Sequence, residues 1–309
     1  MENAKGNKIL MNNIKPYYET KFGKAYLGDT LELIKHLPDN SINLVVTSPP
    51  YGLRKKKEYG NADPEIYVNW FMPFAKEFLR VLKPDGSFVL NIGGGWQKGK
   101  PVRSLYHFEL LLELCKHGGF NLAEEFIWHK PASLPTPAEW VTIRRIRVKD
   151  SIEYVWWLSK TDYPQADNRK VLQPYSASMI SLLKHGYKAK LRPSGHKISE
   201  KFRVDNKGAI PPNFLQFSNT ESNSHYLRMC AEKNIKPHPA RYPSKLPEFF
   251  IKFLTKEGDV VLDPFAGSNV TGEAAEELGR KWLAFELSEE YLKGSKFRFS
   301  HSQKKLNAF

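Results

Sequence analysis

The 309-residue sequence contains only two cysteines, Cys115 and Cys230, which lie far apart in unlike surroundings. This scarcity excludes a disulfide framework and a cysteine-rich zinc site, so we interpret both as reduced structural thiols and expect no metal site. No apolar run approaches the ~20 residues of a membrane-spanning helix, and the N-terminal residues lack the apolar core of a signal peptide. We therefore expect a cytoplasmic protein that does not engage a membrane.

The sequence is also short of acidic residues. Asp and Glu number 33 against 47 Lys and Arg, which gives a formal net charge of +14. Such an excess in a folded protein indicates a polyanionic partner, and nucleic acid is the first candidate. A membrane surface is the rival, which the scattered charge and the lack of a long amphipathic helix disfavour.

Apolar runs and helical periodicity alternate along most of the chain. This alternation predicts an α/β fold with a doubly wound, mostly parallel sheet. Strands are expected at residues 25–29, 42–46, 87–92, 121–128, 152–158, 259–263 and 281–286. Helices are expected at 31–37 with Thr30 as N-cap, at 66–82, 105–116, 245–254 and 269–278, and after Ser288, with a turn at 83–86.

Residues 163–237 interrupt this rhythm. They are polar, rich in Pro, Ser and Asn, and they include a basic stretch with interleaved aromatic residues between Lys184 and Arg203. Such a stretch is typical of a surface that follows a nucleic-acid backbone, although a merely solvated surface gives the same pattern. We interpret the region as a separate module or a long insertion.

Residues 47–51 (TSPPY) follow a buried strand and form the first candidate site. Ligands bind at the carboxyl ends of strands in open parallel sheets. Two prolines make the turn rigid and remove two backbone donors, so it offers carbonyl acceptors, the Ser48 hydroxyl and the Tyr51 ring. This set suits a planar amino group, although a Pro-Pro strand end with a half-buried tyrosine has the same sequence.

Residues 263–272 (DPFAGSNVTG) form a second candidate site, a small-residue turn between a strand and a helix. Gly267 lets the backbone approach a ligand, and the helix start offers free N–H groups. The next strand ends in Glu286, where an acid commonly accepts both ribose hydroxyls. The pattern indicates a nucleoside cofactor, and Asp263 would suit a cationic ligand group. Neither a P-loop nor a dinucleotide motif is present.

With these motifs the sequence resembles the S-adenosylmethionine-dependent DNA amino-methyltransferases, in particular the cytosine-N4 enzymes of restriction-modification systems. The TSPPY motif precedes the cofactor turn, as in the circularly permuted (beta-class) arrangement, with the basic region between them. Further agreement comes from Gly28-Asp29, residues 126–130 (FIWHK) and residues 238–243 (HPARYP). The resemblance implies a Rossmann-like methyltransferase sheet.

The resemblance also implies a division of labour along the chain. Residues 1–162 would form the catalytic half, 163–237 the target-recognition region, and 238–309 the S-adenosylmethionine-binding half. The catalytic residues would be Ser48, Pro49, Pro50 and Tyr51. The cofactor-binding residues would be Asp29, Asp263, Pro264, Phe265, Gly267, Ser268, Asn269 and Glu286. Candidate DNA contacts are basic residues in three segments, namely Arg54, Lys55, Lys56 and Lys57; Arg144, Arg145 and Arg147; and Lys188, Lys190 and Arg192.

The implied reaction moves a methyl group from S-adenosylmethionine to the N4 amino group of a cytosine flipped out of duplex DNA. Neither cysteine lies in the Pro-Cys context that ring-carbon methylation requires. An adenine-N6 DNA methyltransferase is the nearest alternative, since Ser48 favours cytosine without deciding it. An RNA base amino-methyltransferase and a non-catalytic DNA-binding subunit are the others. A restriction endonuclease that shares the recognition sequence is a candidate partner. The sequence does not indicate the oligomeric state.

Overall fold

The computed structural model describes residues 11, 14–53, 60–186, 204–220 and 224–300. Contacts between Cα atoms divide the chain into two units. Residues up to Ala166 together with those from Phe214 onward form the first unit, and Asp167–Asn213 form the second. The second unit contains a 3₁₀ turn, Asn168–Val171, and the helix α4, Ala177–His185. All geometry below concerns the first unit.

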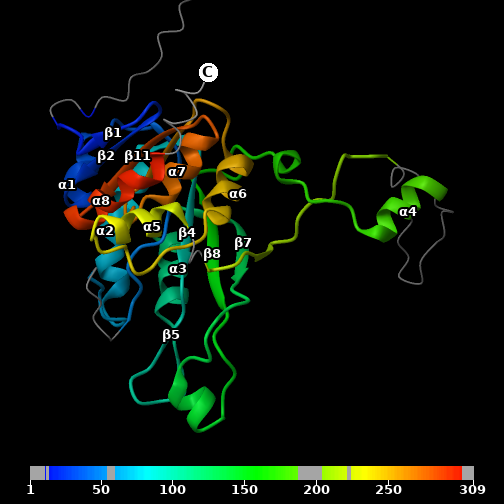
Figure 1. The fold of residues 1–309 in the computed structure, drawn as a ribbon, viewed down its shortest axis with the longest axis horizontal. Helices are drawn as coiled ribbons and strands as arrows, with labels where there is room; N and C mark the ends of the chain where they lie inside the picture. The colour runs from blue at the N-terminus through cyan, green and yellow to red at the C-terminus, as the bar shows by residue number, and fades with distance from the viewer. Residues whose placement is uncertain (1–10, 12–13, 54–59, 187–203, 221–223, 301–309) are drawn as a thin grey trace, which may run out of the picture. The chain divides into compact units, whose positions relative to one another are not determined.

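The first unit is built on a nine-stranded sheet with the order β1-β2-β11-β10-β3-β4-β8-β7-β9 (Figure 1). Strands from β2 to β4 in this order pair in parallel, whereas β8 pairs antiparallel with both β4 and β7. The strands are β1 Tyr18–Glu19, β2 Gly23–Leu27, β3 Ile42–Thr47, β4 Leu82–Ile92, β7 Asn121–His129, β8 Ile152–Ser159, β9 Phe214–Gln216, β10 Val260–Asp263 and β11 Lys281–Glu286, with a separate hairpin of β5 Gly95–Trp96 and β6 Arg103–Ser104.

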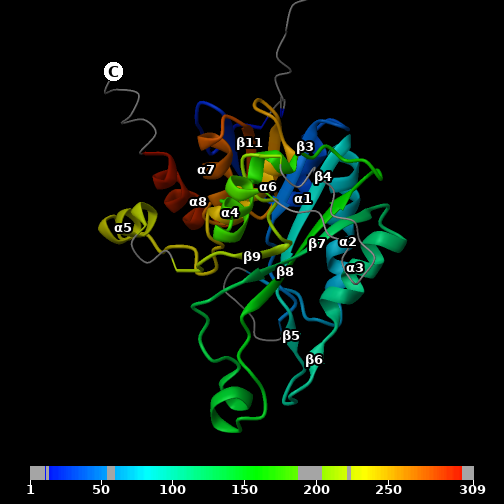
Figure 2. The same cartoon turned by 90° about the vertical axis from the view of Figure 1, so that its right-hand side faces the viewer.

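Helices cover both faces of the sheet, as Figure 2 shows with α2 and α3 to one side and α6 and α7 to the other. The helices are α1 Thr30–Leu33, α2 Tyr67–Val81, α3 Tyr106–Lys116, α5 His225–Glu232, α6 Lys245–Leu254, α7 Val270–Glu277 and α8 Glu289–Ser295. Each face has its own hydrophobic core, one with Phe71 and Phe78 of α2, the other with Phe250 of α6. The predicted doubly wound, mostly parallel sheet is therefore confirmed.

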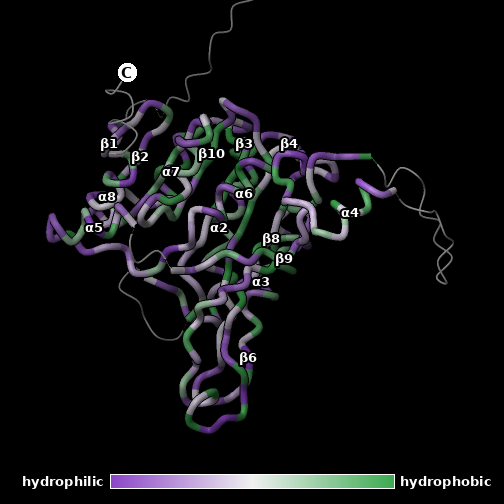
Figure 3. The backbone as a smooth tube through the Cα atoms, turned by 45° about the vertical axis from the view of Figure 1, so that its right-hand side comes forward, coloured by the Kyte–Doolittle hydropathy of each residue, from purple (hydrophilic) through white to green (hydrophobic). Residues whose placement is uncertain are grey.

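Strand β3 lies at the centre of the sheet, and all six of its residues are buried. Both neighbours, β10 and β4, run parallel to it. A parallel strand with helices on both faces needs apolar side chains on both sides, which explains the mostly apolar run before Thr47; its one polar residue, Asn43, accepts from the Val260 N–H. In Figure 3 the residues of this central region are coloured mainly as hydrophobic.

The permuted order follows from where β10 lies. This strand comes late in the chain, yet it pairs with β3 on one side and β11 on the other. The carboxyl ends of β3 and β10, which carry the two candidate motifs, therefore lie next to each other. The two motifs are therefore neighbours in the fold although more than two hundred residues separate them in the sequence.

Two local predictions were wrong. Thr30 does not cap α1, because Asp29 is the N-cap and its carboxylate accepts from the Leu31 N–H. Residues 83–86 do not form a separate turn either. They lie within β4, where the pairing with β3 shifts register between Ile42 and Leu44, so the strand bulges and continues.

Residues 163–237 do not all lie outside the nine-stranded sheet. Strand β9, within that range, pairs in parallel with β7 through Ile127 and Phe214. No helix in the described part of the chain is both long and apolar enough to span a bilayer.

Candidate active site

A hydrogen bond joins the two candidate motifs directly. The Thr47 hydroxyl, at the end of β3, donates to Asp263 Oδ1 at the end of β10 over 2.7 Å. The Phe265 N–H donates to the same oxygen at 3.1 Å, while Oδ2 accepts from Thr271 at 2.5 Å and Tyr242 at 3.0 Å. Burial raises the pKa of Asp263, and these donors oppose that shift. A carboxylate offers about four acceptor positions, so a ligand ammonium group would have to displace one of these donors.

The turn after β10 contains two residues in the left-handed conformation, Gly267 and Asn269. Gly267 has a φ of +51°, which favours glycine, and a Cβ there would lie 3.2 Å from the His238 ring. Asn269 is also left-handed and caps α7 by accepting from the Gly272 N–H at 3.0 Å. The Ser268 hydroxyl accepts from Arg298. The polar side chains of Ser268 and Asn269 are therefore used to stabilise the conformation of the turn itself.

Glu286 ends β11 beside this turn. Its carboxylate accepts from the Gly267 N–H and the Ser288 N–H, each at 2.8 Å. Burial raises the pKa of Glu286, and these two amides lower it in part. A carboxylate offers about four acceptor positions, so Glu286 keeps acceptor capacity for the hydroxyls of a ribose.

Asp29 and Phe265 flank the same edge of the sheet. Asp29 follows β2, where Leu27 pairs with Glu286 and the Gly28 N–H donates to the Glu286 carbonyl at 3.0 Å. Phe265 is half-buried against Trp70 and Phe74 of α2. Pro264 offers its carbonyl to the Thr30 hydroxyl. The predicted cofactor residues are thus brought together, and the donor set, the glycine approach and the aromatic wall fit a nucleoside such as that of S-adenosylmethionine.

The TSPPY turn is fixed by tyrosines from two helices. The Tyr67 hydroxyl of α2 donates to the Pro50 carbonyl at 2.9 Å, and the Tyr106 ring of α3 packs so tightly on Gly52 that a Cβ there would lie 2.8 Å from it. The Tyr51 ring lies against Gly93 in the same way, at 2.6 Å from an added Cβ. Ser48 and Tyr51 are therefore held in fixed positions.

Two polar residues that the sequence analysis did not single out for a role contact the Tyr51 hydroxyl, and a third pairs with one of them. Tyr51 donates to Glu153 Oε2 at 2.6 Å, and Asn91 Nδ2 donates to both at 2.6 Å. Lys130 Nζ pairs with Glu153 Oε1 at 2.5 Å. The available signal was polarity within apolar strands, since Asn91 interrupts FVLNI and Glu153 interrupts IEYVWW. Their proximity follows from β8 lying between β4 and β7, which the sequence order does not reveal.

The predicted DNA contacts are only partly described. Arg54, Lys55, Lys56, Lys57, Lys188, Lys190 and Arg192 lie outside the described residues. Arg144 pairs with Glu139 at 2.7 Å, Arg147 donates to the Pro101 carbonyl at 2.8 Å, and Arg145 is exposed. These three arginines lie around a π-helical turn, Glu139–Ile143, between β7 and β8.

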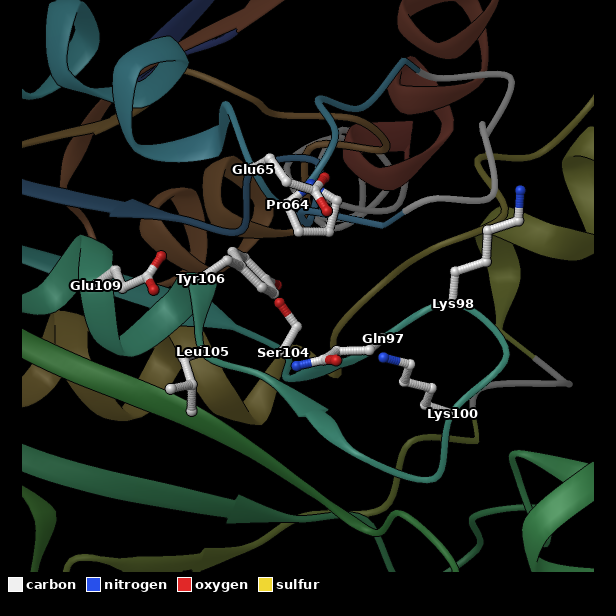
Figure 4. A pocket seen from close by; sticks show the side chains of 9 residues that line it. All are labelled: Pro64, Glu65, Gln97, Lys98, Lys100, Ser104, Leu105, Tyr106 and Glu109. Atoms are coloured by element: carbon white, nitrogen blue, oxygen red, sulfur yellow. The ribbon is translucent and has the colours of Figure 1, made fainter.

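Tyr106, whose ring packs on Gly52, also lines an open hollow of about 380 Å³ (Figure 4). Its lining includes Gln97, Lys98 and Lys100 next to the β5–β6 hairpin, and none of the predicted site residues. The described residues contain no group of three or more His, Cys, Asp and Glu side chains arranged to hold a metal ion.

Comparisons with known proteins agree with this geometry. A family model described as DNA methylase, for N6 and N4 methyltransferases, matches residues 42–297. The type II methyltransferase M.PvuII of Proteus hauseri is 51% identical over 302 residues, which cover 97% of this chain and 90% of the relative.

Solved structures match as well. The PvuII DNA methyltransferase (cytosine-N4-specific) superimposes with a TM-score of 0.77 at 48% identity, covering 93% of this chain and 89% of that one. A putative DNA modification methylase from Thermus thermophilus, complexed with S-adenosyl-L-methionine, gives a TM-score of 0.56 at 25% identity, covering 90% and 93%. The resemblance stated from the motifs is confirmed, and this chain belongs to the DNA methylase family of N6 and N4 amino-methyltransferases.

Proposed function

We propose that this protein is a DNA methyltransferase that transfers a methyl group from S-adenosylmethionine to the N4 amino group of a cytosine in duplex DNA. The observation that carries the proposal is the Thr47–Asp263 hydrogen bond, because it joins the strand ends at which the TSPPY turn and the DPFAGS turn begin. Ser48 in place of an acid before the two prolines favours cytosine over adenine. The cytosine-N4 specificity of the similar PvuII enzyme supports the same choice.

Glu286 would hold the ribose hydroxyls, Gly267 would let the backbone approach the methionine part, and Phe265 would line the adenosine, with Asp29 near the base. Asp263, saturated by protein donors, would set the position of both turns rather than contact the ligand. Pro264, Ser268 and Asn269 would shape the turn through their contacts with Thr30, Arg298 and Gly272. The bound cofactor supplies an activated methyl group on a sulfonium.

Ser48 and the Pro49 carbonyl would accept hydrogen bonds from the target amino group, while Pro50 keeps the turn rigid. An amino group conjugated with its ring is a poor nucleophile, and two acceptors pull it toward tetrahedral geometry and free its lone pair. Positioning of this kind supplies much of the catalysis in such reactions. The base must first leave the duplex, at a cost of a few kcal/mol, and stack on the Tyr51 ring.

Duplex DNA would be bound by the basic surface. Arg145 and its neighbours between β7 and β8, the basic residues 54–57, and the basic residues of 163–237 would contact phosphates. The range 163–237 would carry target recognition. Because M.PvuII is a type II methyltransferase, we extend the proposal to a restriction-modification system with an endonuclease that shares the recognition site.

The test is methylation of genomic DNA by the purified protein with isotopically labelled S-adenosylmethionine, followed by digestion and mass spectrometry of the nucleosides. Labelled N4-methyldeoxycytidine is the expected product. N6-methyldeoxyadenosine would keep the site and overturn the choice of base. Label in RNA alone, or in no nucleic acid, would overturn the proposed function.

A further inference from the structure

The hydroxyl of Ser48 has a defined direction, which is set by a chain of hydrogen bonds behind it. Ser48 Oγ lies 3.1 Å from the Tyr51 hydroxyl, and the Tyr51 hydroxyl lies 2.6 Å from Glu153 Oε2. Three side chains from two segments of the chain are therefore in series, with Ser48 at the outer end and Glu153 at the inner end.

The direction follows from the chemistry of the inner end. An ionised carboxylate only accepts, so the single Tyr51 proton is committed to Glu153. The Tyr51 oxygen then accepts twice, once from Asn91 Nδ2 at 2.6 Å and once from Ser48. Burial, followed by the charge of Glu153, raises the pKa of Tyr51 well above its ordinary value, so the phenol keeps its proton. Ser48 must therefore donate inward.

With its proton directed inward, Ser48 presents only lone pairs to a ligand. Among the described residues, the Tyr51 hydroxyl is the hydrogen-bond partner of Ser48 Oγ, and it accepts. An exocyclic amino group, which offers N–H donors, is the complement of that surface. A ligand that needs a hydrogen-bond donor from Ser48 does not match that surface.

The remaining contacts place a donor at each oxygen of Glu153. Lys130 Nζ pairs with Oε1 at 2.5 Å, and Asn91 Nδ2 donates to Oε2 at 2.6 Å. Because Glu153 is acceptor-only, the assignment of nitrogen and oxygen in the Asn91 amide is settled. The other Asn91 atom, Oδ1, is buried and has no partner among the described residues.

We propose that Glu153 ends a hydrogen-bond relay that runs from the target amino group through Ser48 and Tyr51, and that Glu153 fixes the direction of that relay. The inference rests on the proposed amino-methyltransferase function and assigns the proton that the reaction releases. As the methyl carbon bonds to the amino nitrogen, its bond to sulfur breaks and the nitrogen becomes positively charged. The nitrogen proton passes to Ser48 Oγ, the Ser48 proton to Tyr51, and the Tyr51 proton to Glu153, which becomes a neutral carboxylic acid. Release of that proton to water restores the site.

Glu153 is a positioning residue in this scheme, because it does not touch the substrate. The test compares the single-turnover methylation rate of Glu153→Gln, Tyr51→Phe and the double variant with that of the intact protein. Gln can donate to Tyr51 and reverse the relay, and Phe keeps the ring for stacking but removes the link. We expect each single variant to lose about 10²-fold in rate, the lower range for proton transfer, with cofactor affinity within about 2-fold. The double variant should be no slower than the slower single variant, because both interrupt one path.

Several outcomes would overturn the relay. Single variants at the intact rate, or a double variant whose loss is the product of the two, would show that no shared path exists. A loss of cofactor affinity equal to the loss in rate would show a structural role only. Tyr51→Phe leaves Glu153 paired with Lys130 and Asn91, so the test stands if Glu153→Gln fails to fold. Glu124→Gln, at an exposed position of β7, is the matched control and should keep the intact rate. Absence of methylation by the intact protein, in contrast, would refute the proposed function and not the relay alone.

Discussion

Thr47 and Asp263 are 216 residues apart in sequence and share a hydrogen bond of 2.7 Å in the interior of the protein. The bond joins the ends of adjacent parallel strands, one leading to the catalytic turn and the other to the cofactor turn. The two turns can therefore come together only if β3 and β10 pair in the observed register.

Thr47→Val keeps the shape of the side chain and removes the donor to a buried carboxylate. We expect the free energy of unfolding to fall by about 1.5–3 kcal/mol, the range for hydrogen bonds to charged groups. Urea unfolding followed by fluorescence measures it. Thr142→Val removes an exposed hydroxyl that donates to the Ala138 carbonyl, and should change stability by less than about 0.5 kcal/mol. Equal effects of the two substitutions would contradict the role of Thr47.

Ser48→Ala removes the hydroxyl that faces the target amino group without touching the cofactor turn. The methylation rate should fall by about 10²-fold. The dissociation constant for S-adenosylmethionine, measured by calorimetry, should stay within about 2-fold, since that factor is under 0.5 kcal/mol. Ser41→Ala, which removes an exposed hydroxyl bound to the Pro38 carbonyl, serves as control. A parallel loss of cofactor affinity in Ser48→Ala would refute the separation of the two roles.

Glu286→Gln replaces the carboxylate that we assign to the ribose. Loss of a charged acceptor weakens the cofactor hydrogen bonds, so the dissociation constant should rise by about 10-fold or more. The methylation rate at saturating cofactor should change little. Glu290→Gln changes an exposed acid one turn away on α8 and should leave the affinity unchanged. An unchanged affinity in Glu286→Gln would place the ribose elsewhere.

Much of the fold follows from local pattern. Strand β11 and helix α6 were predicted with their observed bounds, because each combines a clear period with clear ends. The N-cap of α1 was misplaced by one residue, since Asp29 and Thr30 both have capping side chains and only the backbone decides between them. The bulge in β4 was missed because Pro84, Asp85 and Gly86 have the composition of a turn.

The candidate site was predictable where it depends on motifs and unpredictable where it depends on sheet order. TSPPY and DPFAGS sit at strand ends, so their role could be inferred from sequence. Glu153 reaches Tyr51 only because β8 inserts antiparallel beside β4, with Val155 opposite Asn91. No local signal reports which strand lies next to which. The occupied oxygens of Asp263 were hidden for the same reason, since Thr47 and Tyr242 approach from distant segments.

His107 gives a pH dependence of stability. It is buried on α3 among Tyr106, Phe108 and Tyr154, and its Nδ1 has no partner among the described residues. Burial, followed by the charge of Arg103, lowers the pKa of His107 from 6.5 to about 4. Between these values the unfolded chain binds a proton that the folded protein does not, so the free energy of unfolding falls as the pH decreases.

His107→Phe should remove this contribution, because Phe suits the aromatic surroundings and does not titrate. Between pH 6.5 and about pH 5, the intact protein should lose about 1.5 kcal/mol more than the variant. Urea unfolding at the two pH values measures the difference. The same loss in both proteins would mean that His107 is not responsible.

The most direct test of the account is a crystal structure of the protein with S-adenosylhomocysteine, the product left after methyl transfer. The account predicts that both ribose hydroxyls donate to the Glu286 carboxylate, that the backbone at Gly267 faces the amino-acid part, and that the sulfur faces Ser48. A nucleoside bound away from Glu286, for example in the hollow lined by Gln97 and Tyr106, would contradict it.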